Sequence, residues 1–159
     1  MITSKLFIKN LPLILLILSS CGQTNSNTSK TTNVSKIEIK ATFDVPTLIG
    51  KNIDEVRKIL GNPSDNEIEP SRQQMKMNLD TWDNSFEIDG QTLLVSFNPQ
   101  NRKVFDFFIE TNDPSGSTSD YSDLLKVCNV DENNSNYIIE AVPTIKDNSK
   151  FTGIKIKLK

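Results

Sequence analysis

The chain has no histidine among its 159 residues. Histidine is the commonest general base and the commonest metal ligand in proteins, and its charge changes near neutral pH. Serine–histidine catalysis, cysteine–histidine catalysis and histidine-bound zinc are therefore excluded. We expect a protein that uses no cofactor and holds no metal ion.

A long apolar run is also missing. A helix that crosses a bilayer needs about 20 mostly apolar residues, whereas the apolar stretch 11–18 is short and contains a proline. Two lysines precede this stretch, and two serines follow it. A basic start, a short apolar segment and small residues before a cleavage point are the parts of a secretory signal peptide.

The end of this segment reads Leu18-Ser19-Ser20-Cys21. It resembles the lipobox of bacterial lipoproteins, in which the cysteine is acylated and becomes the first residue of the mature chain. The resemblance implies that residues 1–20 are a signal peptide and that Cys21 carries fatty acyl chains such as palmitate. Each buried methylene contributes about 0.8 kcal/mol, so two or more chains hold a protein firmly on a membrane.

The resemblance also implies a location. The mature chain would be anchored to a membrane in the cell envelope. Gly22 and Gln23 carry no acidic retention signal of the enterobacterial kind. The periplasmic face of an outer membrane is therefore favoured, if the organism has one.

The chain has fewer basic residues than acidic ones. Without residues 1–20 the chain keeps 16 basic and 20 acidic residues, a net charge of −4. Nucleic acid would require a basic surface, and anionic lipid would attract a polybasic segment. We expect neither kind of binding. Cys128 is the remaining cysteine, so no intrachain disulfide is expected, and it should pack as a small hydrophobic residue.

The composition divides the rest of the chain into two parts. Residues 21–36 are almost entirely polar and predict a flexible tether behind the lipidated cysteine. Residues 37–159 contain enough apolar positions for one folded domain.

Two helices are predicted in this domain. Asn52 and Glu55 have the spacing of a capping box, and Gly61 and Pro63 mark the end of an apolar stripe. A second helix is predicted over 121–128 from apolar residues at helical spacing.

Alternating apolar and polar residues predict strands in segments 75–80, 82–88, 92–97, 103–110, 137–141 and 154–158. Segment 37–43 is either a first strand, which we favour, or the ordered end of the tether. Asp89-Gly90 and the turn 98–101 connect successive strands. In 103–110, Phe105, Phe107 and Ile109 should share one face, with Val104 and Phe108 on the other. The sequence thus predicts an α+β fold with two short helices on an antiparallel sheet of five or more strands.

We expect twelve apolar residues to be buried together: Ile53, Val56, Leu60, Leu93, Val95, Phe97, Phe105, Phe107, Leu124, Leu125, Ile154 and Ile156.

One further resemblance lies in the predicted first helix. Gly50, Val56, Leu60, Gly61 and Pro63 match a motif of the small outer-membrane assembly lipoproteins of the BamE (SmpA/OmlA) type. A tryptophan-bearing strand and a strand that ends in an aromatic residue extend the likeness over about residues 48–110. The resemblance implies a helix-plus-sheet fold and a role in assembly of the cell envelope.

Two aromatic residues are the candidates for surface recognition. Trp82 could stack on a sugar or anchor a protein contact, although a tryptophan on a sheet is more often in the core. Phe108 is the second candidate, together with Val104, because both should point away from the predicted core face. The lipobox, the absence of histidine and the helix-plus-sheet resemblance favour a non-enzymatic binding or envelope-assembly module, whose partner would be an envelope protein or a glycan.

The alternative is a carboxylate-dependent hydrolase that acts on envelope glycans. Glycosidases use two acids that face each other about 5–10 Å apart, and the chain has 20 acids from which a pair could come. Asp113, Ser115, Ser117 and Asp120 could also surround a calcium ion, but the closing glutamate of such a loop is missing. A capped loop before a helix is expected there instead.

Overall fold

The structure is a computed structural model, and it describes residues 40–159, which belong to one compact unit. The expected signal peptide, Cys21 and the expected tether lie outside the described residues.

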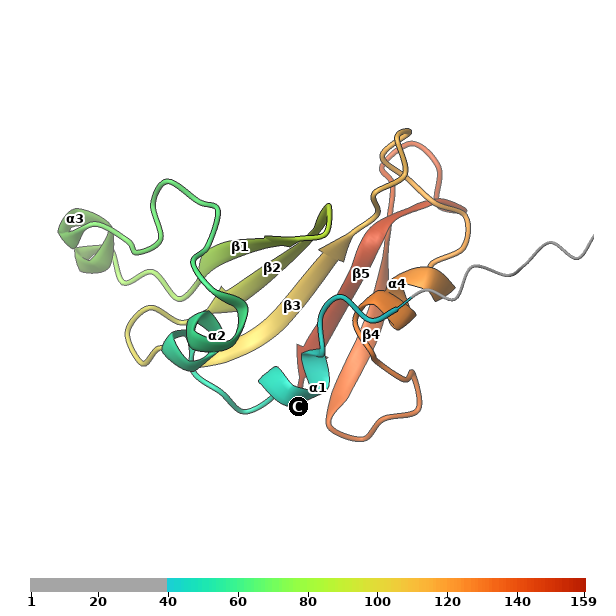
Figure 1. Ribbon diagram of the computed structural model, residues 1–159. Coiled ribbons are helices and arrows are strands. Elements are labelled where there is room, and N and C mark those ends of the chain that lie inside the picture. The colour runs from blue at the N-terminus through green and yellow to red at the C-terminus, as the bar shows by residue number, and fades with distance from the viewer. Residues whose placement is uncertain (1–39) are drawn as a thin grey trace, which may run out of the picture. The chain divides into compact units, whose positions relative to one another are not determined.

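Five strands form one antiparallel sheet in the order β1-β2-β3-β5-β4, accompanied by four short helices (Figure 1). This confirms the predicted α+β class. The elements in chain order are α1 (Val45–Leu48), α2 (Ile53–Leu60), α3 (Arg72–Lys76), β1 (Trp82–Ile88), β2 (Gln91–Phe97), β3 (Val104–Glu110), α4 (Ser122–Val127), β4 (Tyr137–Pro143) and β5 (Phe151–Leu158).

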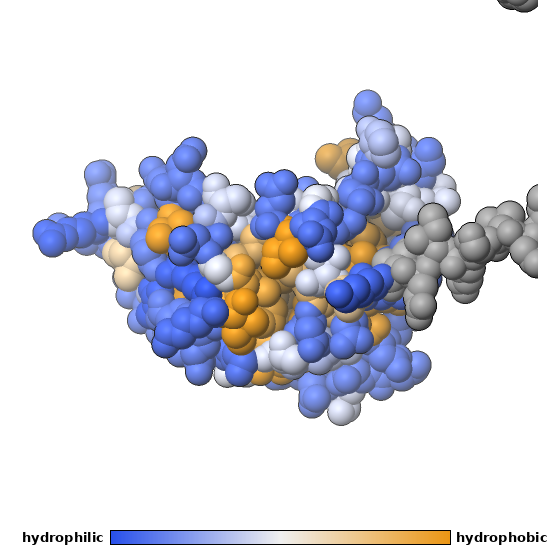
Figure 2. Space-filling model, viewed as in Figure 1, coloured by the Kyte–Doolittle hydropathy of each residue, from blue (hydrophilic) through white to orange (hydrophobic). Residues whose placement is uncertain are grey.

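The hydrophobic core lies on one side of the sheet. The buried apolar residues of α1, α2 and α4 belong to a single cluster with those of the strands, and Figure 1 shows these helices in front of the sheet. A band of hydrophobic surface remains visible on this helix-bearing side between the regions of α2 and α4 (Figure 2). Because α1, α2 and α4 all lie on this side, no helix of residues 40–159 covers the other side of the sheet.

The predicted first helix is present as α2. Asn52 Oδ1 accepts from the backbone N–H of Glu55, and Glu55 Oε2 accepts from that of Asn52, so the capping box is complete. Gly61 follows at a positive φ of 92°, which suits glycine. Ile53 and Val56 are fully buried. The second predicted helix is α4.

The turns between strands are also confirmed. Asp89 and Gly90 join β1 to β2 with positive φ at both residues, as a two-residue hairpin turn requires. Asn98 Oδ1 accepts from the N–H groups of Gln100 and Asn101 in the turn between β2 and β3.

Two predicted strands are wrong. Segment 75–80 does not form a strand, because Arg72–Lys76 is the helix α3. Ser71 caps it by accepting from Gln74 N–H, and the Gln74 side chain accepts in return from Ser71 N–H. This local capping box outweighs the alternation of methionines and polar residues.

The described part of 37–43 is not a strand either. The backbone N–H groups of Thr42 and Phe43 both donate to the carbonyl of Val127 at 2.9 Å, so this segment crosses the end of α4. Phe43 is buried there, and α1 begins at Val45 immediately afterwards, with Pro46 in its first turn. The apolar residue at 43 therefore serves helix packing rather than a strand face.

A β-bulge corrects the predicted faces of β3. Ser96 pairs with Asp106, but Phe97 pairs with Val104, so Phe105 is the extra residue. Val104 consequently turns into the core, where 1% of it is exposed, and Phe105 is only partly buried. Leu60 and Leu125 are also only partly buried. The other nine residues of the expected core are buried.

Candidate functional site

The structure separates the two aromatic candidates. Trp82, at the start of β1, packs partly buried against the hydrophobic core. Its indole Nε1 is buried and has no acceptor among residues 40–159. Phe108 lies on the opposite side of the sheet from the core, opposite Leu94 of β2 and Lys155 of β5. Both residues are partly exposed, and Phe108 is the one on the side of the sheet that no helix of residues 40–159 covers.

We call the side of the sheet that carries Phe108 the open face. Strand pairing arranges its residues in rows that run across the sheet. The middle row consists of Ser85, Leu94, Phe108, Lys155 and Glu140. The row on one side of it consists of Asp83, Ser96, Asp106, Lys157 and Ile138. The row on the other side contains Glu87 and Thr92, then Glu110, Gly153 and Val142.

The ring of Phe108 packs closely against Gly153 of β5. A Cβ placed on Gly153 would lie 2.7 Å from the Phe108 ring and 2.2 Å from the carbonyl oxygen of Ile109. Only glycine fits at this position, because any other side chain would displace the ring or the strand. The Phe108 ring on the open face therefore lies directly against the backbone of Gly153.

Both lysines of the open face form ion pairs with acids of the same face. Lys155 Nζ lies 3.1 Å from Asp106 Oδ2, and Lys157 Nζ lies 2.7 Å from Glu140 Oε2. Asp106 is 5% exposed, and its Oδ1 has no hydrogen-bond partner among the residues that the structure describes. Such an orphaned carboxylate oxygen is rare in folded proteins and requires an explanation.

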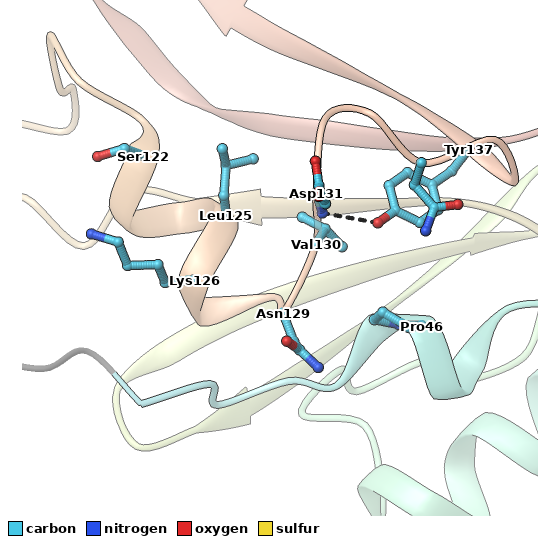
Figure 3. A pocket seen from close by; sticks show the side chains of 9 residues that line it. Pro46, Ser122, Leu125, Lys126, Asn129, Val130, Asp131 and Tyr137 are labelled. Atoms are coloured by element: carbon cyan, nitrogen blue, oxygen red, sulfur yellow. Dashed lines mark hydrogen bonds between the residues drawn. The ribbon is translucent and has the colours of Figure 1, made fainter.

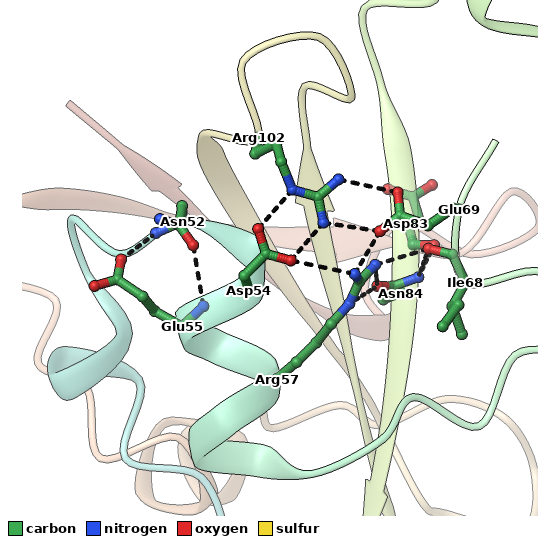
Figure 4. Close-up of polar contacts among 9 residues, drawn as sticks. All are labelled: Asn52, Asp54, Glu55, Arg57, Ile68, Glu69, Asp83, Asn84 and Arg102. Atoms are coloured by element: carbon green, nitrogen blue, oxygen red, sulfur yellow. Dashed lines mark hydrogen bonds and ion pairs between the residues drawn. The ribbon is translucent and has the colours of Figure 1, made fainter.

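A second polar cluster lies on the helix-bearing side (Figure 4). Arg57 of α2 donates through Nε and Nη2 to Oδ1 of the fully buried Asn84, and Asn84 Nδ2 donates to the carbonyl of Ile68. Arg102 donates to both carboxylate oxygens of Asp54 at 2.6 Å. Its donors also reach Glu69.

The charged groups of this cluster pair with one another. The hydrogen bonds from Arg102 lower the pKa of Asp54 and of Glu69. Both guanidinium groups also lie within 6 Å of the centre of the buried Phe97 ring, at 5.6 and 5.8 Å. With two arginines facing two acids, the cluster joins α2, the 61–71 loop and the β2–β3 turn. We assign it a structural role.

Several cavities open elsewhere. One of about 490 Å³ lies beside α4 and is lined by Leu125, Val130 and Tyr137, whose hydroxyl accepts from Asp131 N–H (Figure 3). A second, of about 330 Å³, has Lys51 and Lys103 in its wall. A third, of about 670 Å³, lies under the β4–β5 hairpin.

The acids of the 111–123 loop do not form a catalytic arrangement suited to proton donation. Asp113 and Asp120 line a cavity of about 330 Å³, but each accepts a hydrogen bond from a backbone N–H of its own loop. Hydrogen bonds from Ser115 lower the pKa of Asp113, and those from Ser122 lower that of Asp120. A general acid needs the opposite shift. Within residues 40–159 no group of three metal-binding side chains could hold an ion.

Cys128 lies in the core, and its burial raises the pKa of the thiol to about 12. A thiolate is the reactive form of cysteine, so this residue packs rather than reacts.

Sequence reasoning found Phe108 but missed Leu94 and Asp106. The signal was present, because Asp106 and Phe108 are two residues apart on one strand and so share a face.

Comparison with family models, with curated proteins and with solved structures finds no match for this chain. Within the described residues, no helix is both long enough and apolar enough to cross a membrane.

Proposed function

We propose that this protein is a lipid-anchored, non-enzymatic binding module of the bacterial cell envelope. Two parts of the chain support the proposal: the lipobox-like sequence that ends at Cys21 and the open face of the sheet. The acylated cysteine would place the domain at the membrane surface, and the open face would bind an envelope protein or a glycan.

The open face is the observation that carries the binding role. One side of the sheet is packed against helices, and the other carries the partly exposed Leu94 and Phe108 in the middle row of a largely polar surface. An apolar centre within a polar rim is the usual anatomy of a protein interface. The resemblance of residues 48–110 to BamE-type lipoproteins supports a role in envelope assembly, and the outer membrane is the favoured location.

The anchor is tested by metabolic labelling with a radioactive fatty acid. Wild-type chain should carry the label and fractionate with membranes. The Cys21→Ser variant should lose both the label and the lipoprotein-specific cleavage. Label retained in the variant would show that the N-terminus has been misinterpreted.

The binding role is tested by photo-crosslinking in intact cells. A photoreactive amino acid is placed at Phe108 in one strain and at Ile59, which is 51% exposed on α2, in another. The proposal predicts a discrete crosslinked product from position 108 and none of that product from position 59. The same product from both positions, or none from 108, would contradict a binding role for the open face.

A further inference from the structure

The charges of the open face are unevenly distributed. Both of its lysines form ion pairs, one with Asp106 and one with Glu140. Asp83, Glu87 and Glu110 have no basic nitrogen within 4.0 Å among residues 40–159. All three lie on the half of the sheet formed by β1, β2 and β3, so that half is acidic.

The acids also occupy regular positions. Asp83 and Asp106 lie in one row with Ser96 between them. Glu87 and Glu110 lie on either side of Thr92 in another row. Adjacent strands are about 4.8 Å apart, so the acids within a row are separated by about 10 Å. The two rows are four residues apart along each strand, which is about 13 Å.

Leu94 and Phe108 lie midway between these two acidic rows. The acidic half is thus a rectangle of four carboxylates around an apolar centre. Within the rectangle, Asp106 is buried and pairs with Lys155 through Oδ2, while its Oδ1 has no hydrogen-bond donor among residues 40–159.

We propose that the open face docks an extended basic segment of polypeptide, with an apolar residue flanked by lysine or arginine two residues away on each side. In an extended chain, side chains at alternate positions share a face, and positions four apart are separated by about 13 Å. An apolar side chain over Leu94 and Phe108 would then place one cation at each acidic row. This inference rests on the proposed function, because it specifies the partner of that binding module.

The geometry favours such a segment over a small ligand. None of the cavities described above is lined by Leu94, Asp106 or Phe108. Two sheets that pack face to face keep their strand directions within about 30° of each other. An extended segment that docks with the same alignment keeps its two cations in line with the two rows.

The test uses fluorescent peptides and the purified lipidated full chain in detergent. The first peptide has the core Lys-Thr-Val-Thr-Lys, the second has the same residues in the order Lys-Lys-Val-Thr-Thr, and the third has glutamates in place of both lysines. Fluorescence anisotropy should show that the first binds about fivefold more tightly than the second, the equivalent of about 1 kcal/mol. The third should not bind, and added salt should weaken the first.

Four variants locate the site: Asp83→Asn, Glu87→Gln, Asp106→Asn and Glu110→Gln. Each should weaken binding of the first peptide about threefold or more. Glu132→Gln removes one exposed acid from a loop outside the open face and should leave the affinity unchanged. Thermal unfolding of each variant verifies that it is folded.

Equal affinity for the first two peptides, or equal effects of Glu132→Gln and the open-face variants, would overturn the inference. Fatty-acid labelling and crosslinking from position 108 do not depend on these peptides. A peptide that fails to bind while both of those succeed would refute the basic segment and leave the binding module standing.

Discussion

Asn84 gives the sharpest test of how the structure is held together. It is fully buried, and its Oδ1 accepts from Arg57 Nε at 3.0 Å and from Arg57 Nη2 at 2.6 Å. Its Nδ2 donates to the carbonyls of Ile68 and Asp83. The Asn84→Ala variant removes all four hydrogen bonds and leaves buried polar groups without partners.

The expected cost follows from these contacts. A hydrogen bond to a charged group contributes about 1.5–3 kcal/mol, and an unsatisfied buried group costs about 1–3 kcal/mol. Arg57 keeps its contacts with Glu69 and the Ile68 carbonyl, so part of the loss is recovered. We expect Asn84→Ala to lower the free energy of unfolding by about 2–4 kcal/mol.

Urea unfolding followed by circular dichroism measures this difference. Asn133→Ala is the matched control, because Asn133 is exposed and makes one side-chain hydrogen bond, to Asp131. We expect the control to cost less than about 1 kcal/mol. Equal destabilisation by the two variants would refute the assignment of the arginine cluster as a structural element.

Four further predictions follow from the core, the glycine contact, the arginine cluster and the thiol. Ile53→Ala should cost about 2–5 kcal/mol in urea unfolding, whereas Ile59→Ala on the same helix, at a half-exposed position, should cost far less; similar costs would contradict the orientation of α2. Gly153→Ala should destabilise by about 1–3 kcal/mol through overpacking against Phe108, and a neutral result in thermal unfolding would show that the contact is loose. Arg102 lowers the pKa of Asp54 and Glu69 below their ordinary 3.8 and 4.5, so its contacts with these two acids stabilise the folded state fully above those ordinary values. This stabilisation is lost as the pH falls through the lower pKa values that the two acids have in the folded state. The stability difference between wild type and Arg102→Met should therefore shrink on acidification, and a difference independent of pH would refute this coupling. Iodoacetamide should not modify Cys128 in the folded Cys21→Ser variant but should modify it in guanidinium, and rapid labelling of the folded chain would contradict its burial.

The sequence allowed most of the sheet to be predicted, because its strands have one buried face and alternate cleanly. Leu93 and Val95, or Ile154 and Ile156, are two residues apart and all buried. The helix α2 was equally predictable, since its capping box and its closing glycine are local signals.

The wrong predictions have physical causes that the alternation of apolar and polar residues does not reveal. The bulge at Phe105 depends on how β2 and β3 align, and it turns Val104 into the core and leaves Phe105 only partly buried. The helix α3 depends on the Ser71–Gln74 capping box. For the candidate site, Phe108 was predictable from its strand alone. The acidic rectangle was not, because it combines β1 and β3, which are neighbours of β2 only in the folded sheet.

If the open face binds a partner, it is occupied when the lipidated protein is in its membrane. Carbodiimide modification of carboxyl groups, read by mass spectrometry, compares intact membranes with the purified chain in detergent. We predict that Asp83, Glu87 and Glu110 are protected in membranes, while the exposed loop acids Glu132 and Asp147 react equally in both samples. Equal modification of all five residues in the two samples would contradict the claim.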